Sequence, residues 1–323
     1  MTPAPATSPR VEPRLLESAR CGDDGAFREA VEPHLRELRA HCYRMLGSTH
    51  DAEDALQDAL LRAWGGMSRF EGRFFRAWLY RIATNVCLDH LGSARERRHR
   101  WVEPYPDQWL EPADERHAPE TRYERREAIE LAFVAALQHL PPRPRAVLVL
   151  RDVLGFPARD VAEMLATSVP AVNSALQRAR ATLDQRLPER SQQRTLGLLG
   201  DRRVRELIDA FVDAFERGDV DAMTTLLSRD VVLKERPSLR AHRREAAVAA
   251  LIPSSPRAWR LLPARANAQL AFGAYRWDPA VARYRAAVLD VLTLGDDGVV
   301  AITAFWTPER YPSHGRPPEL PPR

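Results

Sequence analysis

Four acidic residues fall within eight positions of HDAEDALQDALLRAW, residues 50–64, although the chain carries a formal net charge of +4. On a helix, at about 100° per residue, Asp51, Asp54 and Asp58 share one ridge. Leu61 projects from the same polar side. Carboxylates around an exposed leucine are typical of a protein-binding surface with an apolar anchor and a charged rim. Because such a surface repels DNA phosphates, the pattern predicts a basic protein surface as its partner.

A solvated helix face is the alternative interpretation of this ridge. Ser48 and Asp51 fit a helix start, where a serine cap and an acidic first turn are favourable. Against that alternative, few basic residues follow at the i+4 spacing, and Arg62 is the partner available to Asp58. A separate face of the same helix carries the apolar residues that would reach the core: Ala52, Ala55, Leu56, Ala59, Leu60 and Ala63.

A second segment of interest, residues 155–187, has the pattern of a helix-turn-helix. Thr167 and Ser168 supply the turn and the cap of the second helix, and Pro170 is tolerated in its first turn. The first helix would bury Val161, Met164 and Leu165. The second would bury a stripe at helical spacing: Val172, Leu176, Ala179 and Leu183.

The outer faces of the second helix carry side chains that can contact DNA. Asparagine and glutamine can bind adenine edges, arginine can bind guanine or phosphate, and alanine can meet a thymine methyl group. An ordinary helical hairpin with a polar exterior fits the same pattern, so the spacing alone leaves both interpretations open. The residues expected to face DNA are Ala171, Asn173, Ser174, Gln177, Arg178 and Arg180.

Changes of composition divide the 323 residues into two all-α domains followed by an α+β domain. Helical periodicity fills the first two, and a stretch of Arg, Pro and acidic residues without periodicity separates them. The predicted boundaries are a loose N-terminus at 1–14, a helical domain at 15–98, a linker at 99–122, a helix-turn-helix domain at 123–190, an α+β domain at 201–310, and a Pro-rich, disordered tail at 311–323.

The third domain opens with a helical pattern over residues 201–219 and continues with short strand-like runs. The sequence GDDG, residues 295–298, separates two of these runs and indicates a β-hairpin. The runs predicted as strands are 230–235, 257–264, 268–277, 282–294 and 298–306.

Several kinds of chemistry find no support in the sequence. Cys21, Cys42 and Cys87 are widely spaced and form no CxxC pair, so we expect no metal site and no disulfide framework. The sequence contains no GxxxxGK, HExxH or GxSxG motif, and we expect no cofactor. We find neither a signal peptide nor an apolar run near the ~20 residues of a membrane helix. We therefore expect a cytoplasmic protein without a membrane partner.

Taken together, three stretches resemble bacterial sigma factors of the extracytoplasmic-function (ECF) group, in the sigma-70 family. They are LRAHCYRMLGSTHDAEDALQDALLRAWGGM, FRAWLYRIATNVCLDHL and LPPRPRAVLVLRDVLGFPARDVAEMLATSVPAVNSALQRARATL, and the resemblance covers roughly residues 25–187. It implies a transcription initiation factor that binds core RNA polymerase and promoter DNA. Asp51, Asp54, Asp58 and Leu61 would then dock on the clamp helices of the β-prime subunit.

The resemblance also implies that the two helical domains bind different promoter elements. The first helical domain would be sigma region 2, and its loop at residues 68–73 would capture a flipped base of the −10 element. Aromatic stacking with arginine is a usual way to hold an unpaired strand, although Trp78 and Tyr80 could equally be core aromatics. The second domain would be region 4, which binds the −35 element. The residues expected at the −10 element are Arg73, Trp78, Arg81, Asn85 and Asp89.

The third domain resembles the SnoaL-like, or NTF2-like, fold, a curved sheet with helices around a pocket. Enzymes of this fold use Asp and His residues that line the pocket. Here candidate residues are few: they are His242 and Asp290, and neither has an evident partner in the sequence. We therefore favour a regulatory or ligand-sensing domain that binds a small molecule, or that supplements a separate anti-sigma factor. The alternatives are a SnoaL-like enzyme with a DNA-binding appendage and a helix-turn-helix regulator that never joins polymerase.

Overall fold

The computed structural model describes residues 12–71, 74–93, 101–110, 127–238, 240–252, 255 and 258–322. The described chain forms two compact units. The first takes in residues up to 102, 109–110 and 132–187. The second takes in 103–108, 127–131 and 188–322. The predicted helical domain at 15–98 lies in the first unit, as does most of the predicted helix-turn-helix domain, whose residues 127–131 and 188–190 fall in the second unit. The predicted α+β domain lies in the second unit.

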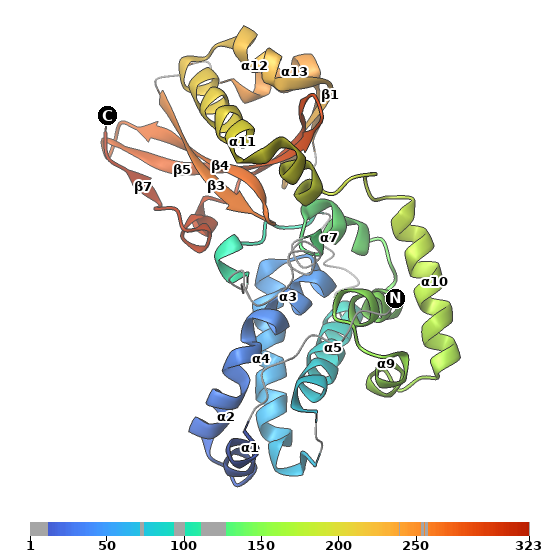
Figure 1. Cartoon of the computed structure of the whole chain (residues 1–323). Helices are drawn as coiled ribbons and strands as arrows, with labels where there is room; N and C mark the ends of the chain where they lie inside the picture. The colour runs from blue at the N-terminus through green and yellow to red at the C-terminus, as the bar shows by residue number, and fades with distance from the viewer. Residues whose placement is uncertain are drawn as a thin grey trace. The chain divides into compact units, whose positions relative to one another are not determined.

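The N-terminal part of the first unit is a bundle built around α3, α4 and α5 (Figure 1). Ser48 caps α4, because its Oγ accepts a hydrogen bond from the Asp51 backbone N–H at 3.1 Å, as the sequence predicted. The predicted core face of α4 is buried except at Leu60, which is half-buried. The elements are α1 (Pro13–Arg20), α2 (Asp24–Val31), η1 (Glu32–His34), α3 (Leu35–Leu46), α4 (Thr49–Gly66), η2 (Met67–Arg69) and α5 (Phe75–Ser93).

The C-terminal part of the first unit contains the predicted helix-turn-helix, formed by α9 and α10. Ser168 caps α10 by accepting a hydrogen bond from the Ala171 N–H at 3.3 Å. Every residue predicted for the two core faces is buried, from Val161 on α9 to Leu183 on α10. The elements are α7 (Leu131–Leu137), α8 (Pro142–Leu148), a π-helical turn (Val149–Val153), α9 (Ala158–Met164) and α10 (Val169–Asp184).

The second unit is the predicted α+β domain, a mixed sheet with helices α11, α12 and α13 packed against it (Figure 1). Its strands follow the order β2-β1-β6-β5-β4-β3, in which β1 and β6 are parallel and the other neighbours antiparallel. The elements are α11 (Gln192–Arg217), α12 (Val220–Leu226), β1 (Leu227–Arg236), β2 (Ala241–Arg243), α13 (Arg244–Leu251), β3 (Trp259–Ala266), β4 (Gln269–Asp278), β5 (Arg283–Gly295), β6 (Gly298–Phe305), η7 (Pro308–His314) and β7 (Glu319–Leu320).

All five predicted strands are present, and Gly295 pairs with Gly298 at the predicted hairpin. Two expectations need correction. The helix predicted over residues 201–219 begins earlier, because α11 starts at Gln192 and bends at Gly200. The C-terminal tail is not disordered over its described residues: Tyr311 is buried, and β7 pairs with β5 through Tyr284 and Leu320.

Tyr311 shows why the tail is ordered. A Cβ on Gly273 would lie 3.0 Å from the Tyr311 ring, so a side chain at that position would collide with the ring. The Tyr311 hydroxyl donates to the backbone within the sheet, with the Ala274 carbonyl oxygen at 3.0 Å. Because successive residues of a strand point to opposite faces, Tyr311 covers the face opposite to Phe272 and α11. The tail thus covers part of the second face of the sheet, over β3, β4 and β5.

Candidate nucleic-acid and polymerase interface

The acidic ridge of α4 lies on the surface. Asp54 and Asp58 are exposed, and the Leu61 side chain is 63% exposed, which is unusual for a leucine. Two histidines approach the carboxylates: His50 Nδ1 lies 3.4 Å from Asp54, and His90 Nε2 lies 3.1 Å from Asp58. We call Asp51, Asp54, Asp58 and Leu61 the α4 acidic surface.

Three of the residues predicted for the −10 element share the exposed ridge of α5. Arg81, Asn85 and Asp89 are exposed, and Asp89 accepts a hydrogen bond from Arg62 of α4 at 2.8 Å. Arg73 lies outside the described residues. The ridge therefore offers a guanidinium and an amide at helical spacing, while the Asp89 carboxylate is engaged with the neighbouring helix.

Trp78, the fourth described residue of that set, is half-buried in a cluster of aromatic rings. Its ring centroid lies 4.9 Å from that of Phe70 and 5.7 Å from that of Phe75. Phe74, immediately before α5, is instead 77% exposed. Phe74 was not predicted from the sequence, because neighbouring aromatics at residues 74 and 75 carry no local signal showing which one faces the core.

Behind the α5 ridge, a half-buried ion pair fixes the start of the helix. Arg76 binds Glu37 of α3 with both Nε and Nη2, at 2.8–3.1 Å, and its guanidinium lies 4.8 Å from the centre of the Tyr80 ring. Burial by itself would raise the pKa of Glu37, but hydrogen bonds from His34 and Arg76 lower it to about 2. Glu37 is therefore ionised at neutral pH and holds Arg76 in place.

The face of α10 that was predicted to contact DNA is open to solvent. All six residues predicted to contact DNA are exposed. Arg180 is already engaged, since its guanidinium binds the Asp152 carboxylate in bidentate fashion at 2.7 and 2.8 Å. Gln177 and Arg178 lie between the capped start of the helix and this pair. The face is therefore exposed as a base-contacting helix requires, with one of its arginines held by the protein itself.

Within the second unit, the side chain of Asn267 binds one residue inside the predicted linker, residues 99–122, and one residue that follows it. Its Oδ1 accepts from the Tyr105 N–H at 2.8 Å, and its Nδ2 donates to the Ile129 carbonyl at 2.8 Å. Asn267 is fully buried and has a φ of 55°, a left-handed conformation that asparagine adopts more readily than most residues. We call Tyr105, Ile129 and Asn267 the linker clamp.

Neighbouring contacts reinforce the linker clamp. The Ala268 N–H donates to Asp107 at 2.8 Å, and the Leu131 N–H donates to Gln269 at 2.9 Å. The Glu130 carboxylate accepts from the backbone N–H groups of Gln192 and Gln193, at 3.0 and 2.8 Å. This places a carboxylate at the start of α11, where the helix dipole favours negative charge. Burial nevertheless raises the pKa of Glu130 to about 7.

The two pocket residues considered in the sequence do not come together. His242 lies on β2 and approaches Glu235 at 3.6 Å, whereas Asp290 lies on β5. Three strand spacings separate β2 from β5, which amounts to roughly 14 Å. Asp290 pairs with Phe272 across the sheet and faces the same side, where Phe272 stacks on Phe211 of α11 with centroids 4.8 Å apart. Burial raises the pKa of Asp290 to about 7.

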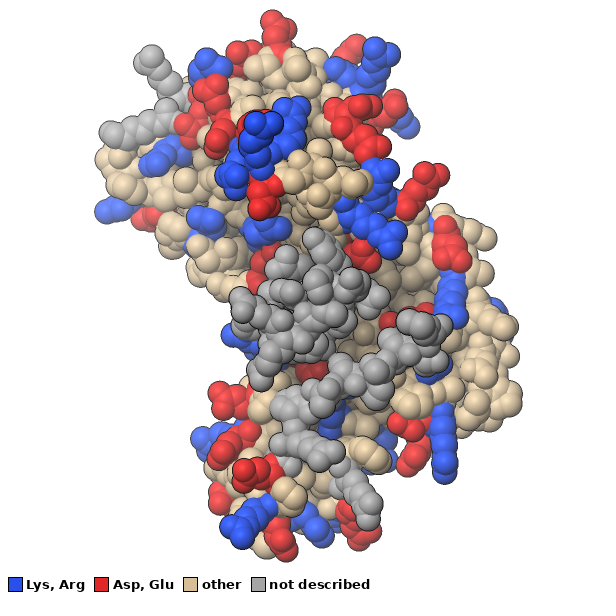
Figure 2. Space-filling view, in the orientation of Figure 1, with Lys and Arg blue, Asp and Glu red and all other residues tan. Residues whose placement is uncertain are grey.

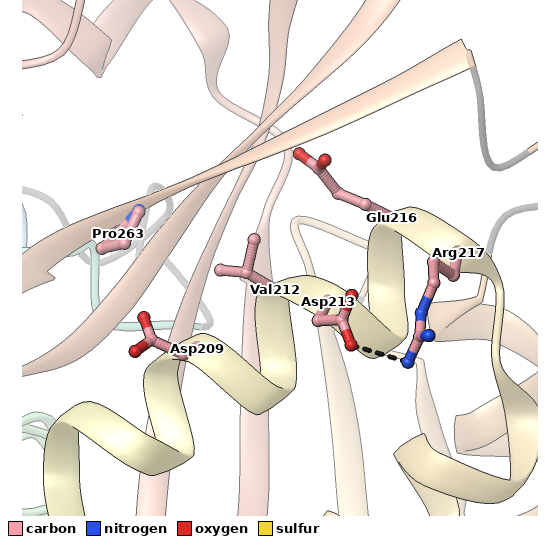
Figure 3. A pocket seen from close by; sticks show the side chains of 6 residues that line it. All are labelled: Asp209, Val212, Asp213, Glu216, Arg217 and Pro263. Atoms are coloured by element: carbon pink, nitrogen blue, oxygen red, sulfur yellow. Dashed lines mark ion pairs between the residues drawn. The ribbon is translucent and has the colours of Figure 1, made fainter.

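A surface hollow of about 440 Å³ lies between α11 and β3 (Figure 3). Three of its charged side chains are engaged: Asp213 binds Arg217 at 2.6 Å, and Glu216 accepts from the Leu261 N–H at 3.0 Å. On the face shown in Figure 2, acidic and basic side chains are interspersed over the second unit. Neither the hollow nor the surface shown in Figure 2 brings together a pair of groups suited to acid–base catalysis.

The fold and the exposed faces define a class of protein: a helical bundle with an acidic surface, a helix-turn-helix and a fused α+β domain. Comparison with known proteins agrees with that class. Residues 30–97 match the family described as Sigma-70 region 2, and residues 130–183 match Sigma-70, region 4. Within the described residues, we find no helix that has both the length and the apolarity to cross a bilayer.

Individual relatives extend the match to most of the chain. The ECF RNA polymerase sigma factor SigG of Mycobacterium tuberculosis is 38% identical over 92% of this chain and 85% of its own length. SigW of Bacillus subtilis is 29% identical over 54% of this chain and 95% of its own. The crystal structure of SigJ from M. tuberculosis matches with a TM-score of 0.59 and 27% identity, covering 86% of this chain and 95% of that one.

The chain therefore belongs to the ECF group of RNA polymerase sigma factors, in the sigma-70 family. The expectation drawn from the three resembling stretches is confirmed. So is the predicted succession of two helical regions and a C-terminal α+β domain. Core RNA polymerase and promoter DNA are the partners that this family membership supports.

Proposed function

We propose that this protein binds core RNA polymerase through the α4 acidic surface and directs it to a two-element promoter. In this proposal the α5 ridge and Phe74 bind the opened −10 element, while Gln177 and Arg178 on α10 bind the −35 element. The protein acts in the cytoplasm, where polymerase lies, and performs no covalent chemistry itself. One observation carries the proposal: a matched region 2 and a matched region 4 expose, respectively, an acidic and a DNA-compatible face.

Run-off transcription with purified core polymerase tests this function. Addition of the protein to core enzyme should give promoter-dependent product from a template selected by its own binding preference. A matched template with a scrambled −35 element should lose most of that product. If the protein binds DNA but never yields product with core polymerase, the alternative of a plain helix-turn-helix regulator holds instead.

We further propose that the C-terminal domain regulates initiation through the linker clamp. The segment from Tyr105 to Ile129 contains most of the predicted linker, which, by resemblance to the family, runs toward the polymerase active centre. Asn267 binds backbone atoms of both, so the two ends are held on the C-terminal domain. A segment tied at both ends is restricted in the path it can follow. Release of the clamp should therefore raise promoter-dependent transcription.

The turn that carries the clamp offers a matched pair of variants. Asn267→Gly removes both side-chain hydrogen bonds and keeps the positive φ accessible, and Ala268→Gly changes the adjacent residue, whose φ is 57°. Two hydrogen bonds of about 1 kcal/mol each correspond to a shift of at most roughly 30-fold in the clamped equilibrium. Transcription should rise several-fold with Asn267→Gly alone. Equal activity of both variants and the unmodified protein would remove the regulatory role of the clamp.

A further inference from the structure

The C-terminal sheet carries a group of cations on the face that the tail covers in part. Residues paired across neighbouring strands point to the same side of a sheet. Gly273, which lies beneath the Tyr311 ring, pairs with Leu289 of β5. Leu289 pairs with Phe305 of β6, and Phe305 pairs with Arg236 of β1. Arg236 therefore points to the same side of the sheet as Tyr311.

Two further cations share this face. Lys234 precedes Arg236 by two positions on β1, so the two side chains leave one side of the strand roughly 7 Å apart. Arg243 of β2 pairs with Val232, which is two positions before Lys234 and so points to the same side. Lys234 and Arg243 are exposed, and Arg236 is half-buried. We call Lys234, Arg236 and Arg243 the cationic face.

Within the described residues, no carboxylate lies at ion-pair distance from the cationic face. Glu235 points to the opposite side of β1, where it approaches His242 at 3.6 Å. Arg236 Nη1 donates to the Glu235 carbonyl at 3.0 Å, but this acceptor is neutral. Asp230, also on β1, is four residues from Lys234, or roughly 13 Å along the strand. The described part of the protein thus leaves these three positive charges without a close counter-charge.

The arrangement is unfavourable for the domain on its own. Partial burial and the neighbouring Arg236 charge lower the pKa of Lys234, and burial lowers the pKa of Arg236. Both shifts mean that the charged side chains are less stable here than in water. A bound anion would oppose both shifts, because an opposite charge nearby favours the charged form. Clustered cations without counter-charges are therefore suited to an anionic partner.

Duplex DNA fits the cationic face better than an acidic protein surface does. The family to which the chain belongs works on promoter DNA. Duplex DNA carries one negative charge per about 1.7 Å of its axis, so phosphates meet the cations in any register, whereas a protein needs carboxylates at matching positions. The segment KERPSLRAHRRE, residues 234–245, has five Lys or Arg among twelve residues, a pattern typical of nucleic-acid-binding patches.

We propose that the cationic face binds the phosphate backbone of duplex DNA, as a third DNA contact beside those of regions 2 and 4. The contact is independent of base sequence, because phosphates carry no sequence information directly. It adds affinity for the duplex around the promoter elements, and salt weakens it. The proposal goes beyond the roles proposed for α5 and α10, and it rests on promoter DNA as the partner in the proposed function.

Lys234 allows a direct footprint, because it is the only lysine in the sequence. An N-hydroxysuccinimide ester of acetate acylates unprotonated amines, so the α-amino group serves as the internal reference. Mass spectrometry of the unmodified full chain measures both acylation rates, with and without a duplex of random sequence. DNA should slow the acylation of Lys234 at least fivefold relative to the reference, and about 1 M salt should abolish the protection. An unchanged rate at saturating DNA would overturn the proposal.

Removal of the three charges supplies a second measurement. A cation that neutralises a phosphate contributes about 0.9 to the slope of log affinity against log salt concentration, so the slope on random-sequence duplex should become shallower by about 2 to 3. The variant carries Lys234→Gln, Arg236→Gln and Arg243→Gln. A control on the exposed surface of α11 removes the same charge and should keep the original slope. The control carries Arg202→Gln, Arg203→Gln and Arg205→Gln.

The affinity for core polymerase separates DNA from an acidic protein partner. If the cationic-face variant keeps its DNA binding but binds polymerase more weakly, the face docks on protein and the proposal is wrong. Equal slopes for this variant and the α11 control would overturn it as well, since net charge alone would then explain the result. Binding to duplex DNA needs no polymerase, so these tests are independent of run-off transcription, whose absence would instead refute the proposed function.

Discussion

The Nε2 atom of His90 on α5 lies 3.1 Å from Oδ2 of Asp58 on α4. Nearby, Arg62 of α4 binds Asp89 of α5 at 2.8 Å, so the two helices are joined twice along their exposed edge. Exposed pairs of this kind add little stability, about 0–1 kcal/mol each. Their consequence is geometric: a partner bound to α4 would fix the direction in which α5 presents the ridge that we propose faces DNA.

Charge reversal on α4 should weaken polymerase binding. The double variant Asp54→Arg and Asp58→Arg replaces attraction to a basic partner with repulsion, and we expect roughly tenfold weaker binding to core polymerase at low salt, with a smaller effect as ionic strength rises. Fluorescence anisotropy of labelled protein measures the affinity. Glu29→Arg, at an exposed position on α2, is the matched control. Unchanged affinity in the double variant would leave the α4 acidic surface without a role.

Substitutions on α10 should reduce promoter use. A base-edge contact from Gln177 or Arg178 is worth about 1–3 kcal/mol, so alanine at either position should cost roughly 5- to 150-fold in affinity and alter sequence preference. A phosphate contact would weaken binding to all sequences alike. Electrophoretic mobility shifts on a library of −35 sequences distinguish the two cases. Gln185→Ala, beyond the end of α10, is the control, and a library profile identical to that of the control would exclude this face.

Phe74 should contribute to promoter opening and not to polymerase binding. An exposed ring that stacks on an unpaired base contributes about 1–3 kcal/mol. Phe74→Ala should therefore reduce open-complex formation on duplex templates at least fivefold, and Phe74→Trp should retain it. Permanganate reactivity of thymines in the −10 element measures the opening. A template with a pre-melted bubble separates opening from capture, and wild-type reactivity of Phe74→Ala on duplex DNA would refute the assignment.

The C-terminal domain should become less stable as pH rises. Burial raises the pKa of Asp290 from an ordinary value of 3.8 to about 7, so between these values the native state keeps a proton that the unfolded state has lost. Stability from this group is complete below about pH 4 and falls until about pH 7, by at most about 4 kcal/mol. Glu130, with a pKa of about 7, acts in the same direction.

Urea unfolding at pH 5.5 and pH 8 measures that effect. Asp290→Asn should remove much of the loss of stability between pH 5.5 and pH 8, and should stabilise the domain at pH 8. The loss of stability that remains would be due to Glu130. Asp230→Asn, at an exposed position on β1, controls for the change of residue type. If Asp290→Asn keeps the full difference between the two pH values, another group causes it.

Local patterns predicted the helices and strands well, because spacing and caps are properties of neighbouring residues. The stripe from Val172 to Leu183, the Ser48 and Ser168 caps and the hairpin at Gly295 all depend on short sequence distances. The same holds for the ridge of Arg81, Asn85 and Asp89, since a helix period places exposed residues as reliably as buried ones.

Long-range pairing could not be predicted in this way. Tyr105 and Asn267 are 162 positions apart, and no sequence motif around either residue predicts their contact. The order of the tail depends on Tyr311 meeting a glycine of β4, which no local pattern reveals. The sequence also could not predict which of two adjacent phenylalanines is exposed. Phe74 and Phe75 are identical in type, and only packing determines that the Phe74 ring is exposed and the Phe75 ring buried.

The regulatory role that we propose for the linker clamp has a quantitative consequence, because all parts of the clamp belong to one polypeptide. A separate inhibitor acts only when its concentration exceeds its dissociation constant, and overproduction of its target can titrate it away. A tethered one is present at a local concentration on the order of millimolar, at a fixed ratio of one to one. Changes in expression level therefore leave the fraction of restrained molecules constant, and only a signal that alters the fold of the chain itself can change it.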